Sequence, residues 1–195
     1  MSSNRLVARG RAALAAALLL ATPGPGRAAE LEGVRLPDSM EVGGTRLQLN
    51  GIGLRTVTIF QVGVYVAGFY LEQPSQDENL ILDSPQTKVL DLHFIHDAPA
   101  DKIRQAWQEG FDSDCTAPCR LPAAAVAEFM SRVVDMRAGD TCTLVYTKDY
   151  VSIAINGREM GRVTDPTFMR AMLTTFIGPH PPTQRLKREL LGRRN

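Results

Sequence analysis

The stretch LRTVTIFQVGVYVAGFYLE, residues 54–72, places a single arginine, Arg55, before sixteen uncharged residues that end at Glu72. Its β-branched and aromatic residues favour strands, and we expect one strand at residues 54–60 and another at residues 62–71. Side chains alternate between the two faces of a strand. The second strand is therefore apolar on both faces, with Gly63, Tyr65, Ala67, Phe69 and Leu71 on one and Val62, Val64, Val66, Gly68 and Tyr70 on the other.

Two interpretations fit this pattern. A strand that is apolar on both faces is typical of the centre of a sheet that is covered on both sides. Alternatively, Gly63 and Ala67 lie between aromatic residues of one face and could leave room for the tail of a ligand. Arg55 needs a partner in either case, because a buried, unpaired cation costs several kcal/mol. That partner can be a protein carboxylate or a ligand carboxylate held by the planar guanidinium.

Strand patterns continue on both sides of this stretch. Residues 40–51 predict two short strands around Gly43 and Gly44, because turn residues separate two strand-like runs. Residues 88–95 predict a further strand, and residues 140–165 predict a three-stranded meander. We expect Leu90, Leu92 and Phe94 to form the core face of the first of these, and the pair Asn156 and Gly157 to form a hairpin turn of the second.

Helical patterns lie between and after these strands. Residues 97–111 and the residues after Pro122 both predict amphipathic helices. A third helix is expected from the cap pair Asp165–Pro166 to Gly178, and a short one within residues 181–192. The apolar stripes of the first two helices are Ile103, Ala106, Trp107, Gly110 and Phe111, and Val126, Phe129, Met130, Val133 and Val134.

The order of these elements indicates the fold class. Strands that follow one another into an antiparallel sheet, with helices grouped between and after them, predict an α+β fold. We expect one curved sheet with helices on one face. A chain of 195 residues, 44% of them hydrophobic, suits one globular domain.

The first 28 residues predict an export signal. A basic start is followed by the apolar run AALAAALLLA, residues 12–21, and then by small and helix-breaking residues. The run is shorter than the ~20 residues that span a bilayer, so we expect cleavage, with Ala28 favoured over Ala29 as the last residue removed. The predicted domain is then residues 29–195, periplasmic or secreted, without a membrane span. The alternative is an uncleaved anchor or a basic amphipathic helix.

Charge argues against nucleic acid as a partner. Removal of residues 1–28 takes away four arginines and no acid, which leaves 18 basic and 21 acidic residues and a net charge of −3. Proteins that bind nucleic acids usually carry a basic surface. The one basic run, RLKRELLGRR at residues 185–194, contains a glutamate and is typical of a solvated helix end.

The three cysteines fit an oxidising compartment. Cys115 and Cys119 flank a Pro-containing turn that can bring their sulfur atoms together, and we expect a disulfide worth roughly 2 kcal/mol by loop entropy. Cys142 lies in a strand pattern and is expected to be a free core thiol. His93 and His96 are expected on opposite faces of their strand, so no metal site is predicted. Cofactors are not expected either, because no Gly-rich phosphate loop precedes a helix.

The residues LNGIGLRTVTIFQVGVYVAGFYLE, LTTFIG (173–178) and LKRELLG (186–192) occur in an order that resembles the chalcone isomerase-like family. The resemblance covers nearly all of the expected domain. It implies an open-faced β-sandwich, in which a large antiparallel sheet and a layer of helices enclose a ligand cleft. Members of this family include plant enzymes that close chalcones to flavanones, plastid proteins that bind fatty acids, and exported bacterial proteins.

The same resemblance implies roles for three residues. Arg55 matches the arginine that faces the cleft and holds an anion. Tyr65 stands where the enzymes carry a threonine, and offers a hydroxyl beside Arg55. Thr175 matches a cleft threonine near a helix end. The enzymes also carry a tyrosine and an asparagine on the helix wall, where this chain offers Gln105, Trp107 and Gln108.

Three functions follow as hypotheses. The leading one is a non-catalytic protein that binds an amphipathic acid, a fatty acid, through Arg55, Tyr65 and Thr175. The second is an intramolecular lyase, or isomerase, that acts on a chalcone-like phenolic enone, with Arg55 and Thr175 polarising an oxyanion. The third is a periplasmic protein that binds a protein partner and has a closed cleft, with Arg55 paired to Asp91 or Glu72.

Overall fold

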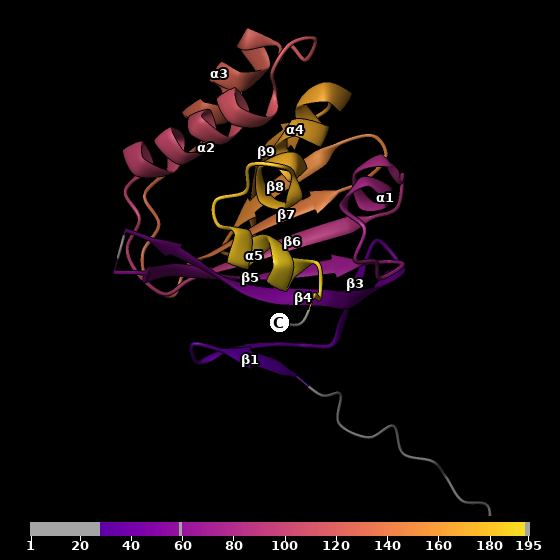
Figure 1. Ribbon diagram of the computed structural model, residues 1–195, viewed down its shortest axis with the longest axis vertical. Helices are drawn as coiled ribbons and strands as arrows, with labels where there is room; N and C mark the ends of the chain where they lie inside the picture. The colour runs from indigo at the N-terminus through magenta and orange to yellow at the C-terminus, as the bar shows by residue number, and fades with distance from the viewer. Residues whose placement is uncertain (1–27, 59, 194–195) are drawn as a thin grey trace, which may run out of the picture.

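The computed structural model describes residues 28–58 and 60–193 (Figure 1). The predicted export signal therefore lies outside the described residues, apart from Ala28. The predicted fold class is confirmed: the chain forms one curled antiparallel sheet with helices packed against it.

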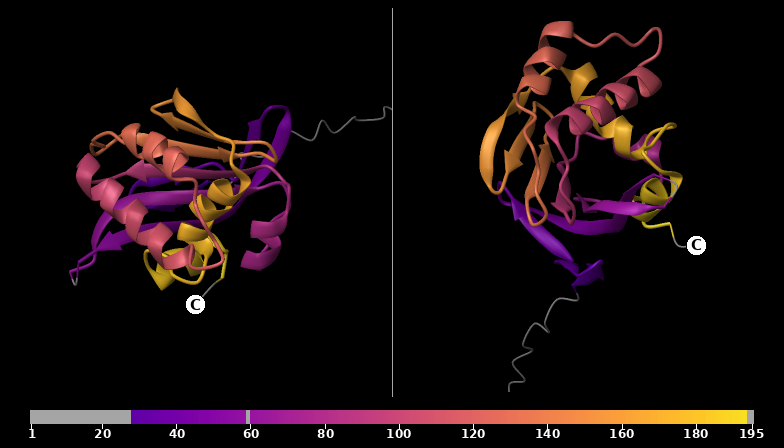
Figure 2. Two further views of the ribbon diagram at one scale, coloured as in Figure 1. Left: turned by 90° about the horizontal axis from the view of Figure 1, so that it is seen from above. Right: turned by 90° about the vertical axis from the view of Figure 1, so that its left-hand side faces the viewer.

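Seven strands form the main sheet in their sequence order, so that each strand pairs with the next (Figure 1). The sheet curls around the helices on its inner face, as the side view in Figure 2 shows. The strands are β3 (Ser39–Val42), β4 (Thr45–Val57), β5 (Val62–Leu71), β6 (Lys88–Phe94), β7 (Thr141–Tyr146), β8 (Val151–Ile155) and β9 (Arg158–Val163).

The bounds of β5 agree with the prediction, but those of β4 do not. The second short strand and the strand expected at residues 54–60 are one continuous strand, which absorbs a register shift between Leu49 and Gly51. This strand ends at Val57 rather than at residue 60. Thr58 and Gln61 adopt positive φ angles of 64° and 52°, which the chain needs to turn back into β5.

Five helices complete the fold. They are α1 (Glu78–Asp83), α2 (Ala100–Asp114), α3 (Ala123–Ser131), α4 (Pro166–Ile177) and α5 (Gln184–Leu190). The sequence did not predict α1, whose first turn is capped by the Asp77 carboxylate. Helix α3 stops before Val133 and Val134, so the predicted apolar stripe is too long, and these two residues belong to the connection that leads to β7.

Strand β5 is covered on both faces, as the first interpretation of its pattern expected. On the inner face, Ala67 and Phe69 pack into the main core beneath the helices. On the outer face, Val66 packs against Leu36 and Leu54 under a hairpin that the sequence did not predict. This hairpin consists of β1 (Ala29–Leu31) and β2 (Val34–Leu36) and lies below the sheet in Figure 1.

Helix α5 lies directly on β4, and glycine makes this possible. A Cβ atom on Gly51 would overlap the backbone carbonyl oxygen of Glu189. The side chain of Asn50 donates to the carbonyl of Leu190 (2.9 Å), and the backbone N–H of Leu54 donates to the Glu189 carboxylate (3.0 Å). The segments LNGIGL and LKRELLG, which are far apart in the sequence, therefore form one interlocked unit beside Arg55.

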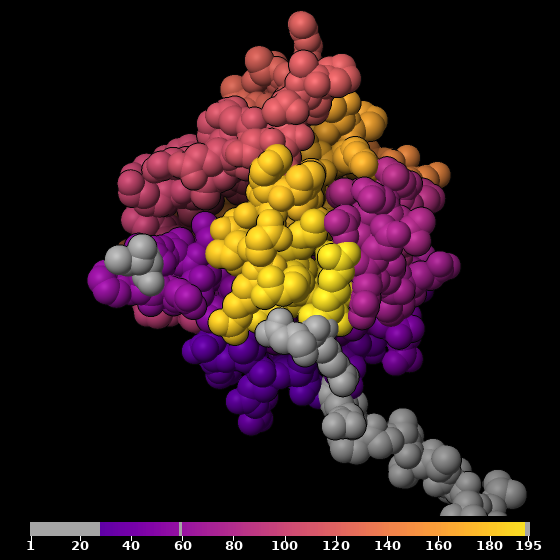
Figure 3. All heavy atoms as spheres, in the orientation of Figure 1, coloured from indigo at the N-terminus to yellow at the C-terminus, as the bar shows by residue number. Residues whose placement is uncertain are grey.

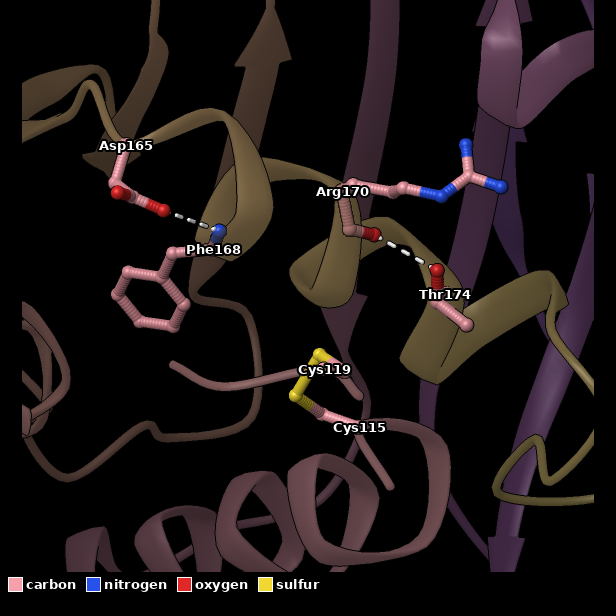
Figure 4. Close-up of a disulfide and its surroundings, with 6 residues drawn as sticks. All are labelled: Cys115, Cys119, Asp165, Phe168, Arg170 and Thr174. Carbon is pink, nitrogen blue, oxygen red and sulfur yellow. Dashed lines mark hydrogen bonds between the residues drawn. A yellow bond between two sulfur atoms is a disulfide. The ribbon is translucent and has the colours of Figure 1, made fainter. Parts of the chain in front are cut away.

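Helix α4 lies at the centre of the inner face, and most of its residues are buried. The Asp165 carboxylate accepts a hydrogen bond from the N–H of Phe168 (2.8 Å) and so caps its first turn (Figure 4). The structure joins Cys115 and Cys119 in a disulfide in the turn that follows α2. Figure 4 places this disulfide between the end of α2 and α4.

Candidate ligand-binding cavity

A cavity of about 690 Å³ lies between the sheet and helices α2 and α3. Its volume is in the range of small-molecule sites, which is roughly 300–1,000 Å³. Apolar side chains form most of its wall. The sheet contributes Leu92, Phe94, Leu144, Ile153 and Ile155, and the helices and the segment after α3 contribute Ile103, Ala106, Trp107, Phe129, Val133 and Phe176.

The helices are held over the cavity by an aromatic cluster and a close contact. Trp107 of α2 lies 5.1 Å from Phe129 of α3 and 5.5 Å from Phe176 of α4, ring centre to ring centre. A Cβ atom on Gly110 would lie 2.9 Å from the methyl group of Thr175, so α2 touches α4 at this point. These contacts fix the outer wall of the cavity, while the inner wall is the sheet itself.

Arg55 lies in the wall of this cavity, close to the end of β4. Its Nη1 donates to the backbone carbonyls of Thr56 and Pro182, the second at 3.1 Å. Among the described residues, no carboxylate lies within salt-bridge distance of its guanidinium. The charge of Arg55 is therefore not neutralised by a described acid, and its side chain lines the cavity.

The two acids that we considered as internal partners of Arg55 are bound elsewhere. Asp91 accepts from the Thr143 hydroxyl (2.8 Å) and contacts His93 Nε2 (2.8 Å) on the outer face of the sheet. Glu72 accepts from the backbone N–H of Thr87 (2.7 Å). The pairing of Arg55 with Asp91 or Glu72, which the third hypothesis required, is therefore wrong.

Tyr65 lies directly opposite Arg55 in the register of β4 and β5. Residues paired in this way have side chains on the same face of the sheet, so both reach the cavity. The Tyr65 ring packs against Phe94, with 5.4 Å between the ring centres. Burial raises the pKa of Tyr65 to about 12, although the positive charge of Arg55 acts in the opposite direction. The phenol therefore stays neutral at physiological pH and can donate to an anion.

Thr175 also lines the cavity, but from the helix side. Its hydroxyl donates to the backbone carbonyl of Met172 (2.8 Å), as threonine often does within a helix. The structure therefore brings all three predicted residues to one cavity. Only Arg55 and Tyr65 form a pair, and the Thr175 proton is already engaged.

The space for a ligand tail is not where the alternation of β5 placed it. A register shift after Arg55 leaves Val64 as an extra residue, so Gly63 points outward, towards Ile95 and Leu54. Ala67 and Phe69 belong to the packed core and do not line the cavity. The open volume lies instead over β6, β7 and β8. The meander pattern showed which residues share a face, but no signal in the sequence shows that α2 and α3 stand away from that face.

Cys142 of β7 is one of the cavity residues that the sequence did not assign to a site. It is a free thiol, as predicted, and it is half-buried. Burial raises its pKa to about 12, with a smaller contribution from Asp91 in the same direction. The thiol therefore stays protonated, and acts here as a small apolar side chain.

The comparison with known proteins agrees with this architecture. The sequence profile described as chalcone isomerase-like matches residues 28–192. The chain belongs to the chalcone isomerase-like family. No curated protein sequence matches it. Among solved structures, it is similar to the Arabidopsis thaliana fatty-acid binding protein AtFAP1, with a TM-score of 0.70 and 18% identity, over 85% of this chain and 96% of the other.

The polar groups on the helix wall of the cavity of this chalcone isomerase-like chain include Lys102, Glu109 and Ser113 of α2, but neither of the two glutamines that the sequence offers there. Gln105 and Gln108 of α2 are exposed and bond along the helix, to Glu109 and Asp112 (both 2.8 Å). Trp107 is the one of the three expected wall residues that lines the cavity. The described residues 28–58 and 60–193 also contain no metal-binding cluster, and none of their helices has the length and apolar content needed to cross a membrane.

Proposed function

We propose that this protein binds a long-chain fatty acid without transforming it. Its carboxylate would lie between Arg55 and Tyr65, and its alkyl chain would fill the cavity over β6, β7 and β8. The observation that carries the proposal is the guanidinium of Arg55, which meets two backbone carbonyls and no described carboxylate at the end of an apolar cavity. The likeness to AtFAP1, a fatty-acid binding protein by name, supports it.

The expected energies favour a long chain over a small anion. A hydrogen bond to a charged group contributes ~1.5–3 kcal/mol net, whereas association costs at least ~4 kcal/mol. The head group alone therefore binds weakly. Ten buried methylene groups would add ~8 kcal/mol, at ~0.8 kcal/mol each, and the cavity of about 690 Å³ supplies the apolar surface for them.

The nature of the wall argues against catalysis. Cyclisation of a chalcone develops negative charge on the substrate, and an enzyme stabilises such charge with donors held in place beforehand. Here the Thr175 hydroxyl donates to its own helix, and the two glutamines of α2 donate to Glu109 and Asp112 of the same helix and do not line the cavity. Binding of an alkyl chain needs none of these groups.

The proposed location is the periplasm or the extracellular space. The sequence of residues 1–28 favours export, and the disulfide between Cys115 and Cys119 supports an oxidising compartment.

The single tryptophan provides a direct test, because Trp107 lies in the cavity wall. The protein is stripped of lipid and titrated with oleic acid and with oleyl alcohol, which differ only in the head group. We expect both to change the Trp107 fluorescence, with the acid binding about tenfold more tightly or better. Equal affinities for acid and alcohol, or no fluorescence change with either, would refute the proposal.

The Tyr65 hydroxyl is expected to contribute less than Arg55. In Tyr65→Phe the ring and its contact with Phe94 remain, and only one neutral donor to the carboxylate is lost. We expect oleic acid to bind about three- to tenfold more weakly, since such a bond contributes ~0.5–1.5 kcal/mol. Oleyl alcohol serves as the control ligand in the same titration. A loss of both ligands to the same extent would mean that the substitution damages the cavity rather than the head-group contact.

The pH dependence of binding follows from the raised pKa of Tyr65. Because the phenol titrates at about 12, it remains a donor throughout the range from pH 6 to 10, and the affinity for oleate should change less than about twofold there. Below about pH 5 the ligand carboxyl takes up a proton and binding should weaken. Titrations in buffers of equal ionic strength test this. A steep loss of affinity between pH 8 and 10 would show that the phenol ionises early, contrary to its burial.

A further inference from the structure

The tip of the β4–β5 hairpin exposes large apolar side chains. Phe60 is 82% exposed, Val62 is 44% exposed and Val57 is 36% exposed. Figures 1 and 2 show the hairpin projecting beyond the sheet, at the end opposite to α1. Two further large apolar residues of the described chain are exposed to this degree. One of them, Val134, lies with Val57 in the wall of the cavity, so the tip is next to its mouth.

Cations lie at the base of this apolar tip. A shallow groove of about 480 Å³ lies beside it, and Arg55 and Arg185 both line this groove, as do Thr56, Thr58 and Gln61. Residues 56–71 carry no charge at all. The apolar side chains of the tip therefore lie beside hydroxyl and amide groups of the same hairpin and beside two guanidinium groups, one from β4 and one from α5. Arg185 also bonds the Glu189 carboxylate (2.7 Å), whereas Arg55 bonds no described acid.

We propose that this tip docks on an anionic phospholipid bilayer. Phe60 enters the boundary between head groups and acyl chains, where aromatic residues are favoured. Arg185 faces the lipid phosphates, and Arg55 joins it when the cavity holds no ligand. A protein partner fits this surface less well. Stable protein interfaces bury about 800 Å² on each side, and the described residues of the tip offer three exposed large apolar side chains on one narrow hairpin. Docking in this position also brings the mouth of the cavity to the membrane surface. Figure 3 shows α2, residues 178–190 and this hairpin on one face of the molecule, and all three contribute residues to the cavity wall.

This inference goes beyond the proposed function, and its test needs no ligand in the cavity. The protein is sedimented with vesicles of phosphatidylcholine and with vesicles that also contain phosphatidylglycerol. We expect binding to the anionic vesicles, weakened about tenfold in the double variant Phe60→Ser/Val62→Ser. Leu80→Ser is the matched control, because Leu80 is an equally large apolar residue, 66% exposed, on the distant helix α1. Absence of binding by the unaltered protein, or an equal loss in both variants, would overturn the proposal.

A second readout separates docking through the tip from attachment through the N-terminal segment. The variants Phe60→Trp and Leu80→Trp both retain Trp107, so the difference between them reports on the new tryptophan alone. With vesicles whose acyl chains carry bromine, we expect stronger fluorescence quenching in Phe60→Trp than in Leu80→Trp. Equal quenching would show that the hairpin stays outside the bilayer, even where the protein sediments with the vesicles.

Discussion

Arg55→Gln should weaken the binding of oleic acid by about ten- to a hundredfold and leave oleyl alcohol almost unaffected. The substitution removes a cation of the cavity wall that no described carboxylate pairs with, and with it one or two charge-assisted hydrogen bonds worth ~1.5–3 kcal/mol. Glutamine is long enough to fill part of the same space. The measurement is the Trp107 titration with the two ligands, and the ratio of the two affinities should fall to about one.

Arg185→Gln is the matched control for this prediction. Arg185 is also an arginine of the groove beneath the hairpin, but it bonds Glu189 and does not line the main cavity. We expect the ratio of acid to alcohol affinity to stay as it is in the unaltered protein. Arg55 also donates to two backbone carbonyls, so thermal unfolding of both variants should be measured beside the titrations. A folded Arg55→Gln protein that still prefers the acid would place the head group elsewhere.

The resemblance to the chalcone isomerase-like family placed Tyr65 beside Arg55, and the structure pairs the two residues across β4 and β5. Two strands joined by a short turn must lie antiparallel, and a residue near the end of the first then faces a residue near the start of the second. Arg55 and Tyr65 are such a pair. The chemistry of a lone cation beside an apolar strand was visible in the same nineteen residues.

The position of the cavity was beyond what the sequence could predict. A single extra residue, Val64, reverses the orientation of Gly63, and a bulge of this kind leaves no distinctive residue pattern. The volume itself depends on how far α2 and α3 stand from the sheet. That distance is set by the contacts of Trp107 with Phe129 and Phe176, which join three separate helices.

The sequence also did not predict that β1 and β2 cover the outer face of the sheet. These strands are three residues long each, too short for a recognisable alternation, and Leu36 is the residue that makes their packing against Val66 possible. Helix α1 was missed for a similar reason, since its six residues bury only Ile81. Elements that depend on one buried side chain are determined by the rest of the fold rather than by their own sequence.

Gly51→Ala should destabilise the protein by about 3 kcal/mol, which is the largest effect on stability that we expect from a single methyl group. Its Cβ atom would overlap the carbonyl oxygen of Glu189 and lie 2.6 Å from that of Leu190, and both are backbone atoms of α5 that cannot turn aside. The helix cannot simply move away. Asn50 and Leu54 bond to its last turn, and Gly192 passes so close that a Cβ atom there would lie 2.6 Å from the Asn50 carbonyl.

Gly53→Ala provides the graded comparison, two residues along the same face of β4. Its Cβ atom would lie 2.9 Å from the Cβ of Glu189, which needs a small shift of the helix, and 3.0–3.1 Å from Leu186 Cδ1 and Glu189 Oε2, which are flexible side-chain ends. We therefore expect a loss of about 1 kcal/mol or less, against about 3 kcal/mol for Gly51→Ala, in urea unfolding curves of the two variants. In thermal unfolding, the Gly51→Ala loss corresponds to a fall of roughly 6–12 °C for a domain of this size. Equal stabilities would mean that α5 does not press on β4 at Gly51. The close contact between α5 and β4 that joins the segments LNGIGL and LKRELLG would then be wrong. That contact requires a residue without a side chain at position 51.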